Sequence, residues 1–425
     1  MSAVIQKYRE VGFVPVIAGA DTGAYALARA FHEAYGIPSF SLGKAELWMI
    51  RHSEIVRYLP VASATDPDEL LKGLETAELD QLRETGVKLL LLGSMDATVQ
   101  AIIQLRDAGR LPLGFVAPYV DQQRFEAGTI KHNFSALAQR LGINHPVTRI
   151  VDLAQPLDTQ LPLNISFPVW AKPSDVSAWL HISFEGRKKV HRMQTPEELQ
   201  QLLSAAEEAG YRGSFVVQEE IPGDDQQMRV LTCYCDADSR IRFASYGETI
   251  VEDHSPALLG NPSVILTGQN SQAVEQAQQL VSELKWVGYA NFDLKYDPRD
   301  GSTKFFELNP RLGNSSYYVT GTGHNPVTWY VADWILNTLP PAAGQPPLET
   351  TEETVYTLLP KWLAPRYVTD PQRRRRVAKL LRSGGARNPF FYAADRSLRR
   401  RPLVLAAQAK LVKKFFTYYP PHRSP

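Results

Sequence analysis

The first 118 residues alternate short apolar runs with segments of helical spacing. Strands without polar positions are buried on both faces, and such strands occur mainly in parallel sheets that helices cover. This region therefore predicts a doubly wound α/β lobe. The expected strands are "FVPVIAG" (13–19), "IPSFSL" (37–42), "VKLLLLGS" (87–94) and "LGFVAP" (113–118), and the expected helices span 20–36, 67–85 and 96–107.

From residue 129 onward the order of elements changes, because strands now follow one another in pairs. This order predicts α+β lobes rather than more of the doubly wound lobe. The turn "DPRDG" (297–301) separates the last two expected strands and indicates a hairpin. The expected strands are 167–173, 214–220, 228–235, 240–247, 288–296 and 303–309, and the helices are 129–141, 195–209 and 270–285.

A chain of 425 residues is too long for one ordinary hydrophobic core. We expect an α/β domain over 1–128, a smaller α+β lobe over 129–222 and a larger α+β lobe over 223–338. The Pro-rich stretch "LPPAAGQPP" (339–347) predicts a linker, so that 339–425 forms a separate basic region.

The composition, with 44% hydrophobic and 21% charged residues, is that of a globular protein. No apolar run approaches the ~20 residues that a membrane-spanning helix needs, and the N-terminus has no signal-peptide pattern. We therefore expect a cytoplasmic protein. Cys233 and Cys235 are too few for a tetrahedral metal site and are expected to pack in a core.

The predicted hairpin carries oxygen ligands at the end of both strands. Asn309 follows Glu307 by two residues and so shares its face, and antiparallel pairing would bring Asp293 near both. Carboxylate and amide oxygens suit Mg²⁺, with Mn²⁺ as an alternative. The competing interpretation is a polar hairpin end in which Glu307 pairs with Arg311.

Two lysines favour a nucleotide near this hairpin. Lys172 ends the apolar strand "FPVWAKP", where burial without an anion would be costly. Lys131 begins a predicted helix, whose N-terminus attracts anions. Both are candidate phosphate ligands, and each could instead be an ordinary solvated lysine.

The segment "VVQEEIPGDDQQMRV" could bind the base and the ribose of a nucleotide. Its strand ends over Gln218, Glu219, Glu220 and Ile221, where main-chain groups could read an adenine edge, and Asp225 could accept ribose hydroxyls. The competing interpretation is an acidic turn at Pro-Gly.

These motifs together resemble the ATP-grasp superfamily, and within it the carboxylate–amine ligases of the D-aspartate ligase type. The resemblance covers roughly residues 13–337 and rests on six segments in a fixed order. They are "VIAGADTGAYALARAFHEAYGIPS", "KHNFSALAQRLGI", "FPVWAKP", "QEEIPGDD", "GYANFDLKYD" and "FFELNPRLGNSS". It implies an ATP-grasp fold with an N-terminal α/β lobe and two α+β lobes enclosing ATP, followed here by a basic C-terminal extension.

The resemblance also implies a role for each matching residue. Lys131 and Lys172 would bind the ATP phosphates, residues 218–221 the adenine and Asp225 the ribose. Asp293, Glu307 and Asn309 would bind Mg²⁺, and Arg311 would steady the reacting carboxyl group. The implied reaction is amide formation through an acyl phosphate.

One segment departs from the family pattern. The loop that covers the phosphates is usually Gly-rich, whereas "PSDVSAWLHISFEG" follows Lys172 here. Ser174, Ser177 and Ala178 are small enough for a phosphate cradle, but Trp179 and Leu180 are not typical of one. The departure therefore bears on loop closure and, with it, on turnover.

The sequence gives fewer indications of the residues that contact the substrates. The segments 246–263 and 313–323 offer His254 and Ser315 as candidate substrate contacts, although either could be satisfied within a loop. We expect the substrates to be an amino acid such as D-aspartate and an amine on a peptidoglycan precursor. An L-amino-acid or small-peptide ligase is the alternative enzyme, and a non-catalytic ATP-binding regulatory module is the alternative outside enzymes.

The C-terminal region differs from the rest of the chain in charge. Residues 361–425 contain 17 Lys and Arg against 2 Asp, a net charge of +15, whereas the remainder has 29 basic and 43 acidic residues, a net −14. Apolar spacing among the bases is typical of a segment that binds an anionic membrane surface. The alternatives are a basic arm for nucleic acid, disfavoured because base-stacking motifs are absent, and a solubilising extension packed on the acidic remainder. The sequence does not predict an oligomeric state.

Overall fold

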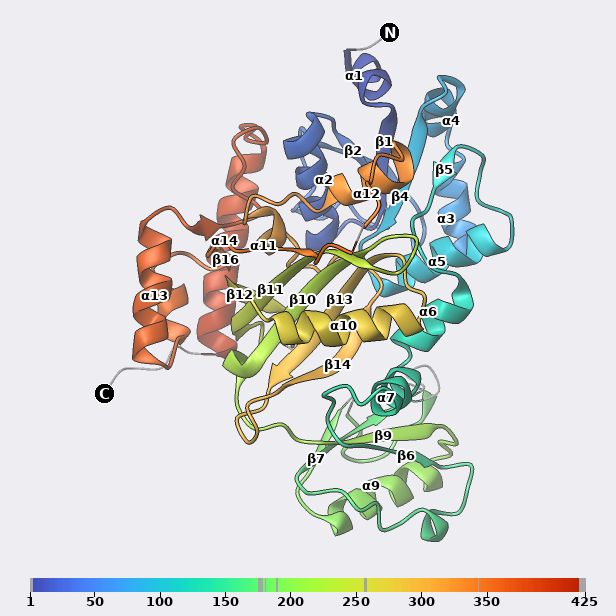
Figure 1. Ribbon diagram of the computed structural model, residues 1–425, viewed down its shortest axis with the longest axis vertical. Coiled ribbons are helices and arrows are strands. Elements are labelled where there is room, and N and C mark those ends of the chain that lie inside the picture. Colours follow the sequence, from blue (N-terminus) through green and yellow to red (C-terminus); the bar gives the residue numbers. More distant parts are fainter. Residues whose placement is uncertain are drawn as a thin grey trace. The chain divides into compact units, whose positions relative to one another are not determined.

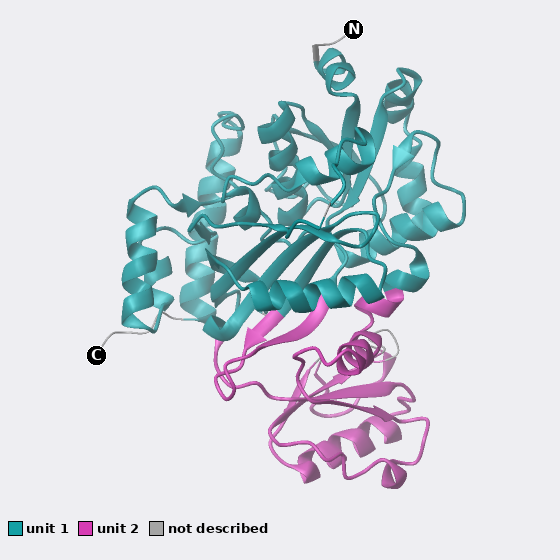
Figure 2. Ribbon diagram, viewed as in Figure 1, with its two compact units in different colours: residues 1–125, 225–293, 309–425 teal, residues 126–224, 294–308 magenta. Residues whose placement is uncertain are grey.

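The computed structural model describes residues 3–174, 179, 181–188, 190–255, 258–342 and 344–419. The chain forms two compact units (Figure 2). Unit 1 contains residues 1–125, 225–293 and 309–425, and unit 2 contains residues 126–224 and 294–308. This division is coarser than the four segments expected from the sequence, whose boundaries stay a prediction.

The N-terminal part of unit 1 is the predicted doubly wound lobe (Figure 1). Its five strands are all parallel, in the order β3-β2-β1-β4-β5. β1 and β2 are buried at every position, as expected for strands of a parallel sheet that helices cover, and the two serines of β2, Ser39 and Ser41, are buried as well. The strands are β1 (Phe13–Ala18), β2 (Ser39–Gly43), β3 (Val56–Pro60), β4 (Lys88–Gly93) and β5 (Phe115–Val116), and the helices are α1 (Ala3–Val11), α2 (Thr22–Tyr35), α3 (Pro67–Leu74), α4 (Ala77–Glu84) and α5 (Asp96–Asp107). The next helix, α6 (Gln122–Thr129), has residues in both units.

An eight-stranded sheet follows in the order β14-β13-β10-β11-β12-β16-β17, with β15 paired to β11. The helix α10 (Ser271–Glu283) packs on β10 and β11 (Figure 1). The unit boundary passes within β13 and β14, so both strands contribute residues to each unit. The strands are β10 (Met228–Cys235), β11 (Ile241–Glu252), β12 (Pro262–Gly268), β13 (Gly288–Tyr296), β14 (Thr303–Asn309), β15 (Leu348–Glu349), β16 (Val355–Thr357) and β17 (Ala386–Arg387).

Unit 2 is built on an antiparallel four-stranded sheet in the order β6-β9-β7-β8. One face of this sheet packs on α9 (Pro196–Glu208) through Val169, Ala171 and Leu203. Its other elements are α7 (Lys131–Arg140), β6 (Thr148–Asp152), β7 (Val169–Pro173), β8 (His191–Met193) and β9 (Ser214–Glu219).

The C-terminal region is folded into unit 1 rather than set apart from it. Two helices, α13 (Pro371–Arg382) and α14 (Arg400–Tyr418), follow the predicted linker, whose described residues form no helix or strand. Phe415 of α14 and Val377 of α13 share a core with β12 and β16. Ion pairs join Lys414 to Asp253 and Arg373 to Glu248. The excess positive charge is thus partly matched by acids of unit 1.

Some elements differ from the sequence expectations. The helix expected over 67–85 is two helices, because the chain leaves helical geometry at Thr76, which is extended (φ −78°, ψ 144°). The strand expected at 113–118 is only Phe115–Val116. Strand β12 was missed, since its residues fall within and after the segment that we expected to be a substrate loop.

The expectation for Cys233 and Cys235 is met, since both are buried as free thiols. None of the helices in the described residues combines the length and apolar character needed to cross a membrane.

Unit 1 also contains short helical elements. They are η2 (Asp225–Gln227), α11 (Tyr317–Thr320), α12 (Val327–Tyr330), η3 (Val331–Ile335) and η4 (Ala364–Tyr367).

Candidate active site

The predicted site residues divide between the two units. Unit 2 carries Lys131, Lys172, residues 218–221 and Glu307. Unit 1 carries the remainder, which are Asp225, His254, Asp293, Asn309, Arg311 and Ser315.

In unit 2, the structure brings a predicted phosphate ligand and a predicted metal ligand together. Lys131, the first residue of α7, places its Nζ 2.8 Å from Oε2 of Glu307 on β14. The main-chain N–H of Phe305 donates to the carbonyl of Asn144 (2.8 Å), which fixes β14 against the loop after α7. A half-exposed pair of this kind contributes little to stability, so both groups can exchange partners at low cost.

Lys172 and Gln218 lie on one face of the unit 2 sheet. The register pairs Trp170 with Gln218 and Lys172 with Val216, and these four residues alternate with core residues such as Ala171. Gln218 donates from Nε2 to Oγ1 of Thr148 on β6 (3.1 Å). The face that carries both candidate ligands is therefore the one opposite the α9 core.

The segment after Lys172 is described only in part. Residues 175–178 and Leu180 lie outside the described residues, so the expected phosphate cradle at Ser177 and Ala178 stays a prediction. Trp179 is buried in the unit 2 core, where its Nε1 donates to the carbonyl of Lys188 (2.9 Å) and its ring packs edge-on against Tyr211 and Phe215. The residue that looked unusual for a cradle is thus a core residue.

His145 makes unit 2 sensitive to acid. Its Nε2 lies 3.0 Å from Oγ of Ser135, and burial lowers the pKa of His145 from 6.5 to about 4. The unfolded chain therefore binds a proton that the folded chain does not bind between these values. Stability is fully present above about pH 6.5 and falls as the pH approaches about 4, by up to ~3 kcal/mol.

We expect His145→Gln to remove this pH dependence. The measurement is hydrogen exchange of unit 2 amides in the full chain at a series of pH values. His132→Gln, at an exposed position of the same α7, is the control and should keep the wild-type slope. Equal slopes in wild type and His145→Gln would contradict the assignment.

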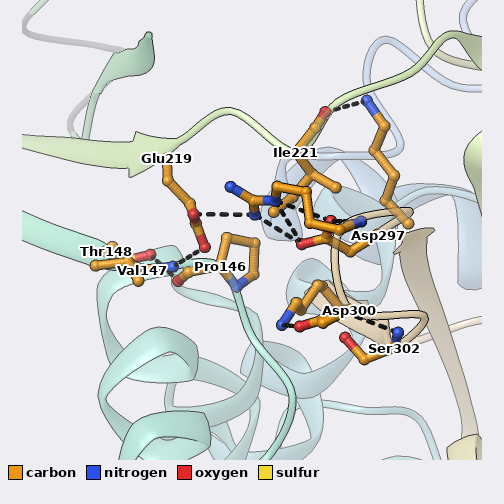
Figure 3. Close-up of polar contacts among 11 residues, drawn as sticks. Pro146, Val147, Thr148, Glu219, Ile221, Asp297, Asp300 and Ser302 are labelled. Atoms are coloured by element: carbon orange, nitrogen blue, oxygen red, sulfur yellow. Dashed lines mark hydrogen bonds and ion pairs between the residues drawn. The ribbon is translucent and has the colours of Figure 1, made fainter. Parts of the chain in front are cut away.

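Figure 3 shows how the side chains of the predicted adenine segment are held. Oε1 of Glu219 accepts from the N–H of Val147 (2.9 Å), and its Oε2 lies 3.0 Å from Nη2 of Arg299 in the hairpin turn. Arg299 also binds Asp297, which lowers the pKa of that carboxyl group. These contacts tie β9 to the turn between β13 and β14.

The rest of the adenine segment is also partnered. Glu220 pairs with Arg192, whose hydrogen bonds lower the pKa of Glu220. The carbonyl of Ile221 accepts from Nζ of Lys295 (2.8 Å), as Figure 3 shows. The carboxylates of Glu219 and Glu220 therefore position the segment, and the carbonyl of Ile221 already accepts a hydrogen bond.

In unit 1, Asn309 and Asp293 form the oxygen-rich end of the hairpin. Nδ2 of Asn309 donates to Oδ2 of Asp293 (3.2 Å) and to the carbonyl of Asn291 (3.3 Å). Because the amide nitrogen is turned to these acceptors, the amide oxygen of Asn309 is the atom left for a cation. Asn309 is also buried, which fixes this orientation.

The donor set fits Mg²⁺ shared with phosphate oxygens. Two carboxylates and one amide oxygen are hard ligands, and Mg²⁺ is usually bound by one or two carboxylates together with phosphates. In the described part of the chain, no three His, Cys, Asp or Glu side chains are placed to hold a metal by themselves.

Arg311 lies among carboxylates that the sequence did not point to. Its Nε is 2.8 Å from Oδ1 of Asp96, the first residue of α5. Asp21, the N-cap of α2, is close enough for Arg311 to affect its titration, although burial dominates and raises the pKa of Asp21. The guanidinium is thus oriented by a carboxylate of the N-terminal lobe.

Asp225 and His254, predicted for different roles, contact each other. Oδ2 of Asp225 lies 2.7 Å from Nε2 of His254 and accepts from the N–H of Glu252 (2.9 Å). The His254 ring stacks on Tyr419 with 3.9 Å between centroids. His254 is therefore part of a network that reaches the C-terminal region.

The loop after Arg311 packs closely against the start of α2. Ser315 is buried, and the neighbouring Asn314 has a buried Oδ1 with no hydrogen-bond partner among the described residues. A Cβ at Gly23 would lie 2.9 Å from that oxygen, so a larger residue there would require the Asn314 side chain to shift. Asp21 and Asp96 could have been suspected from the sequence only as helix-start residues, a signal that says nothing of Arg311.

Solved structures with a similar fold show which class of protein this fold belongs to. Solved structures of similar fold include the L-amino acid ligase from Bacillus licheniformis (15% identity, TM-score 0.52, covering 77% of this chain and 76% of that one). They also include the N5-carboxyaminoimidazole ribonucleotide synthetase from Thermus thermophilus (18%, 0.54, 80% and 80%). A third is the biotin carboxylase domain of the Hydrogenobacter thermophilus 2-oxoglutarate carboxylase, in complex with MgADP (14%, 0.56, 81% and 73%). The fold is that of the ATP-grasp enzymes.

A curated relative identifies the family more closely. The D-aspartate ligase of Enterococcus faecium (strain Aus0004) is 30% identical over 418 residues, which cover 96% of this chain and 97% of the relative. The chain therefore belongs to the ATP-grasp carboxylate–amine ligases related to D-aspartate ligase, which form carbon–nitrogen bonds. No protein-family model matches the chain.

Proposed function

We propose that this protein joins the carboxylate of an amino acid to an amine, at the expense of ATP, through an acyl phosphate. The observation that carries the proposal is the Lys131–Glu307 pair. A candidate phosphate ligand and a candidate metal ligand lie 2.8 Å apart on separate elements of unit 2. A metal-bound phosphate would replace this contact with one to each partner.

The chemistry explains why these residue types are needed. A carboxylate is a poor acyl donor, because its leaving group would be oxide. Its oxygen attacks the γ-phosphorus of ATP, ADP leaves, and the amine nitrogen then attacks the acyl carbon while phosphate departs and the nitrogen loses a proton. Lys131 and Lys172 would hold the phosphates, and Arg311 would hold the carboxyl group in line.

Asp293, Glu307 and Asn309 would hold Mg²⁺, which neutralises charge on the transferred phosphoryl group. Gln218 and the main chain up to Ile221 would contact the base, and Asp225 the ribose. His254 and Ser315 are proposed substrate contacts in unit 1. We propose the same four segments as domains, with boundaries at 128, 222 and 338.

For the substrates, we propose an amino acid such as D-aspartate and an amine on a peptidoglycan precursor. The support is the D-aspartate ligase relative, which aligns over almost the whole chain. An L-amino-acid ligase activity is the alternative, since an enzyme of that name has a similar fold.

Phosphate release in the presence of paired amino acids and amines tests this function. We expect release that needs both substrates, and a new amide in the mass spectrum of the product. ATP binding without amine-dependent release would instead support a regulatory ATP-binding module. D-aspartate and L-amino acids in parallel reactions separate the two proposed activities.

A second proposal concerns a membrane surface. Leu398, Leu405 and Phe391 are exposed (84%, 63% and 47%), although large apolar side chains are usually buried. Phe391 and Leu405 line one shallow cavity of about 250 Å³ together with Arg396 and Arg401. Apolar side chains among bases suit the headgroup region of an anionic bilayer.

We expect Leu398→Glu combined with Leu405→Glu to reduce binding to phosphatidylglycerol vesicles by about tenfold or more. The double variant loses two apolar side chains that would be buried in the bilayer, and its two added carboxylates are repelled by the anionic headgroups. Cosedimentation of the full chain measures it. A deletion of this region is unsuitable, since Phe415 and Val404 are core residues. Leu113→Glu, at a position that is 92% exposed, is the control, and equal pelleting of wild type and the double variant would remove the proposal.

A further inference from the structure

A cavity of about 550 Å³ in unit 1 has a lining with positive but no negative side chains. Its size lies within the range of small-molecule sites, roughly 300–1,000 Å³. The cationic residues are Arg29, Lys361 and Arg387, and no Asp or Glu lines the cavity. None of these residues belongs to the nucleotide site proposed above.

The C-terminal region supplies most of this cavity. It contributes Lys361, Arg387 and Gln408, whereas α2 and α11 contribute Arg29 and Tyr317. Residues distant in sequence therefore converge on one space. The region that the sequence suggested to be an extension is here one wall of a cavity.

Two of the charges remain unneutralised within the described chain. Nε of Arg29 pairs with Glu33 (2.7 Å), so its charge is matched. Arg387 binds only carbonyl oxygens, those of Gly321 (2.6 Å), Gly384 (2.7 Å) and Ala386 (3.3 Å). Lys361 is exposed and has no ion pair or hydrogen bond to any described residue.

Two of the three cationic side chains, Arg29 and Arg387, are held in place before any ligand arrives. Arg29 stacks between the rings of Tyr317 (4.1 Å) and Tyr392 (4.5 Å). A Cβ at Gly321 would lie 2.5 Å from Cγ of Arg387, so the arginine is pressed against the end of α11. Fixed donors lose little freedom on binding, which favours a specific ligand over loose counter-ions.

We propose that this cavity binds an oxyanion, a phosphate or carboxylate group of a small molecule, through Lys361 and Arg387. A guanidinium and an ammonium donate to such oxygens in charge-assisted hydrogen bonds. The side-chain amide of Gln408, which has no hydrogen bond to a described residue, supplies a further donor. The anion is either a group carried by the amine acceptor or a separate molecule, and both share this chemistry.

Lysine labelling in the full chain tests the site without relying on turnover. Acetic anhydride is applied with and without millimolar inorganic phosphate, and mass spectrometry measures acetylation at Lys361 and at Lys413, an exposed lysine of α14 outside this cavity. Phosphate should slow acetylation of Lys361 severalfold and leave Lys413 unchanged. Equal rates at Lys361 with and without phosphate would overturn the proposal.

A pair of variants gives a second readout. Lys361→Glu should weaken phosphate binding in ³¹P titrations by about tenfold, the effect of losing one charge-assisted contact, and Lys413→Glu should not. Phosphate bound at the nucleotide site is common to both variants and cancels in the comparison. Equal affinities would count against the site even if the ligase reaction were confirmed.

The labelling also distinguishes the two sources of the anion. If an amine that supports phosphate release also protects Lys361, the cavity binds the acceptor. If only inorganic phosphate protects it, the cavity binds a separate anion. Both results support the site, and because labelling needs no catalysis, failure of the proposed ligase function would leave it standing.

Discussion

Glu307→Gln should lower amine-dependent phosphate release by about 10³-fold, comparable to the loss of a group that stabilises transition-state charge. The amide keeps the size of the side chain but removes the charge that would hold Mg²⁺. It also removes the charge paired with Lys131. ADP binding in the presence of Mg²⁺ should weaken by at least about tenfold, whereas ADP binding without metal should change little.

Stability separates this effect from misfolding. The Lys131 and Glu307 side chains are 50% and 33% exposed, so losing their pair should cost less than about 1 kcal/mol. Glu208→Gln, at an exposed position of α9 in the same unit, is the matched control and should behave as wild type. Unchanged phosphate release in Glu307→Gln would reject the metal assignment.

Asp395→Asn should destabilise unit 1 by about 3–5 kcal/mol, because it leaves a buried guanidinium without a counter-charge. Nε of Arg400 lies 2.9 Å from Oδ2 of Asp395, and the two side chains are 1% and 0% exposed. Oδ2 also accepts from Tyr25 (2.7 Å) and Ser53 (2.9 Å), and Oδ1 accepts from the N–H of Glu54 (2.7 Å). The carboxylate thus joins the C-terminal region to the N-terminal lobe.

Hydrogen exchange of α2 and α14 amides in the full chain measures this loss. Glu353→Gln is the control, since its pair with Arg376 also involves the C-terminal region but is exposed (47% and 46%). It should cost less than about 1 kcal/mol. Similar losses in the two variants would show that burial of the Asp395 pair does not decide its contribution.

The elements that the sequence predicted well are those with uninterrupted patterns. The strand of β1 and the helix α5 were expected almost at their observed bounds, because a fully apolar run and a regular helical period are local signals. β3 was missed since it is a half-exposed edge strand with little apolar pattern. β12 was missed because turn-type residues precede it, although the sheet buries five of its seven positions.

The candidate site shows the same division. Asp293, Glu307 and Asn309 were selected from strand spacing, and the hydrogen bond between Asn309 and Asp293 agrees with the expected hairpin. Asp96, which contacts Arg311, could not be selected, because its helix begins more than 200 residues earlier in the chain. Nothing local to either residue encodes that contact.

The sequence by itself determined the strands and helices that carry a strong local pattern, the ATP-grasp motifs and the charge imbalance of the C-terminal region. Tertiary structure alone decided that this region folds into unit 1, that Asp225 meets His254, and that Lys361 and Arg387 face a cavity with Arg29. The physical reason is the distance along the chain over which each effect acts. Periodicity and turn chemistry act over a few residues, whereas burial of charge and convergence of donors depend on which distant segments pack together.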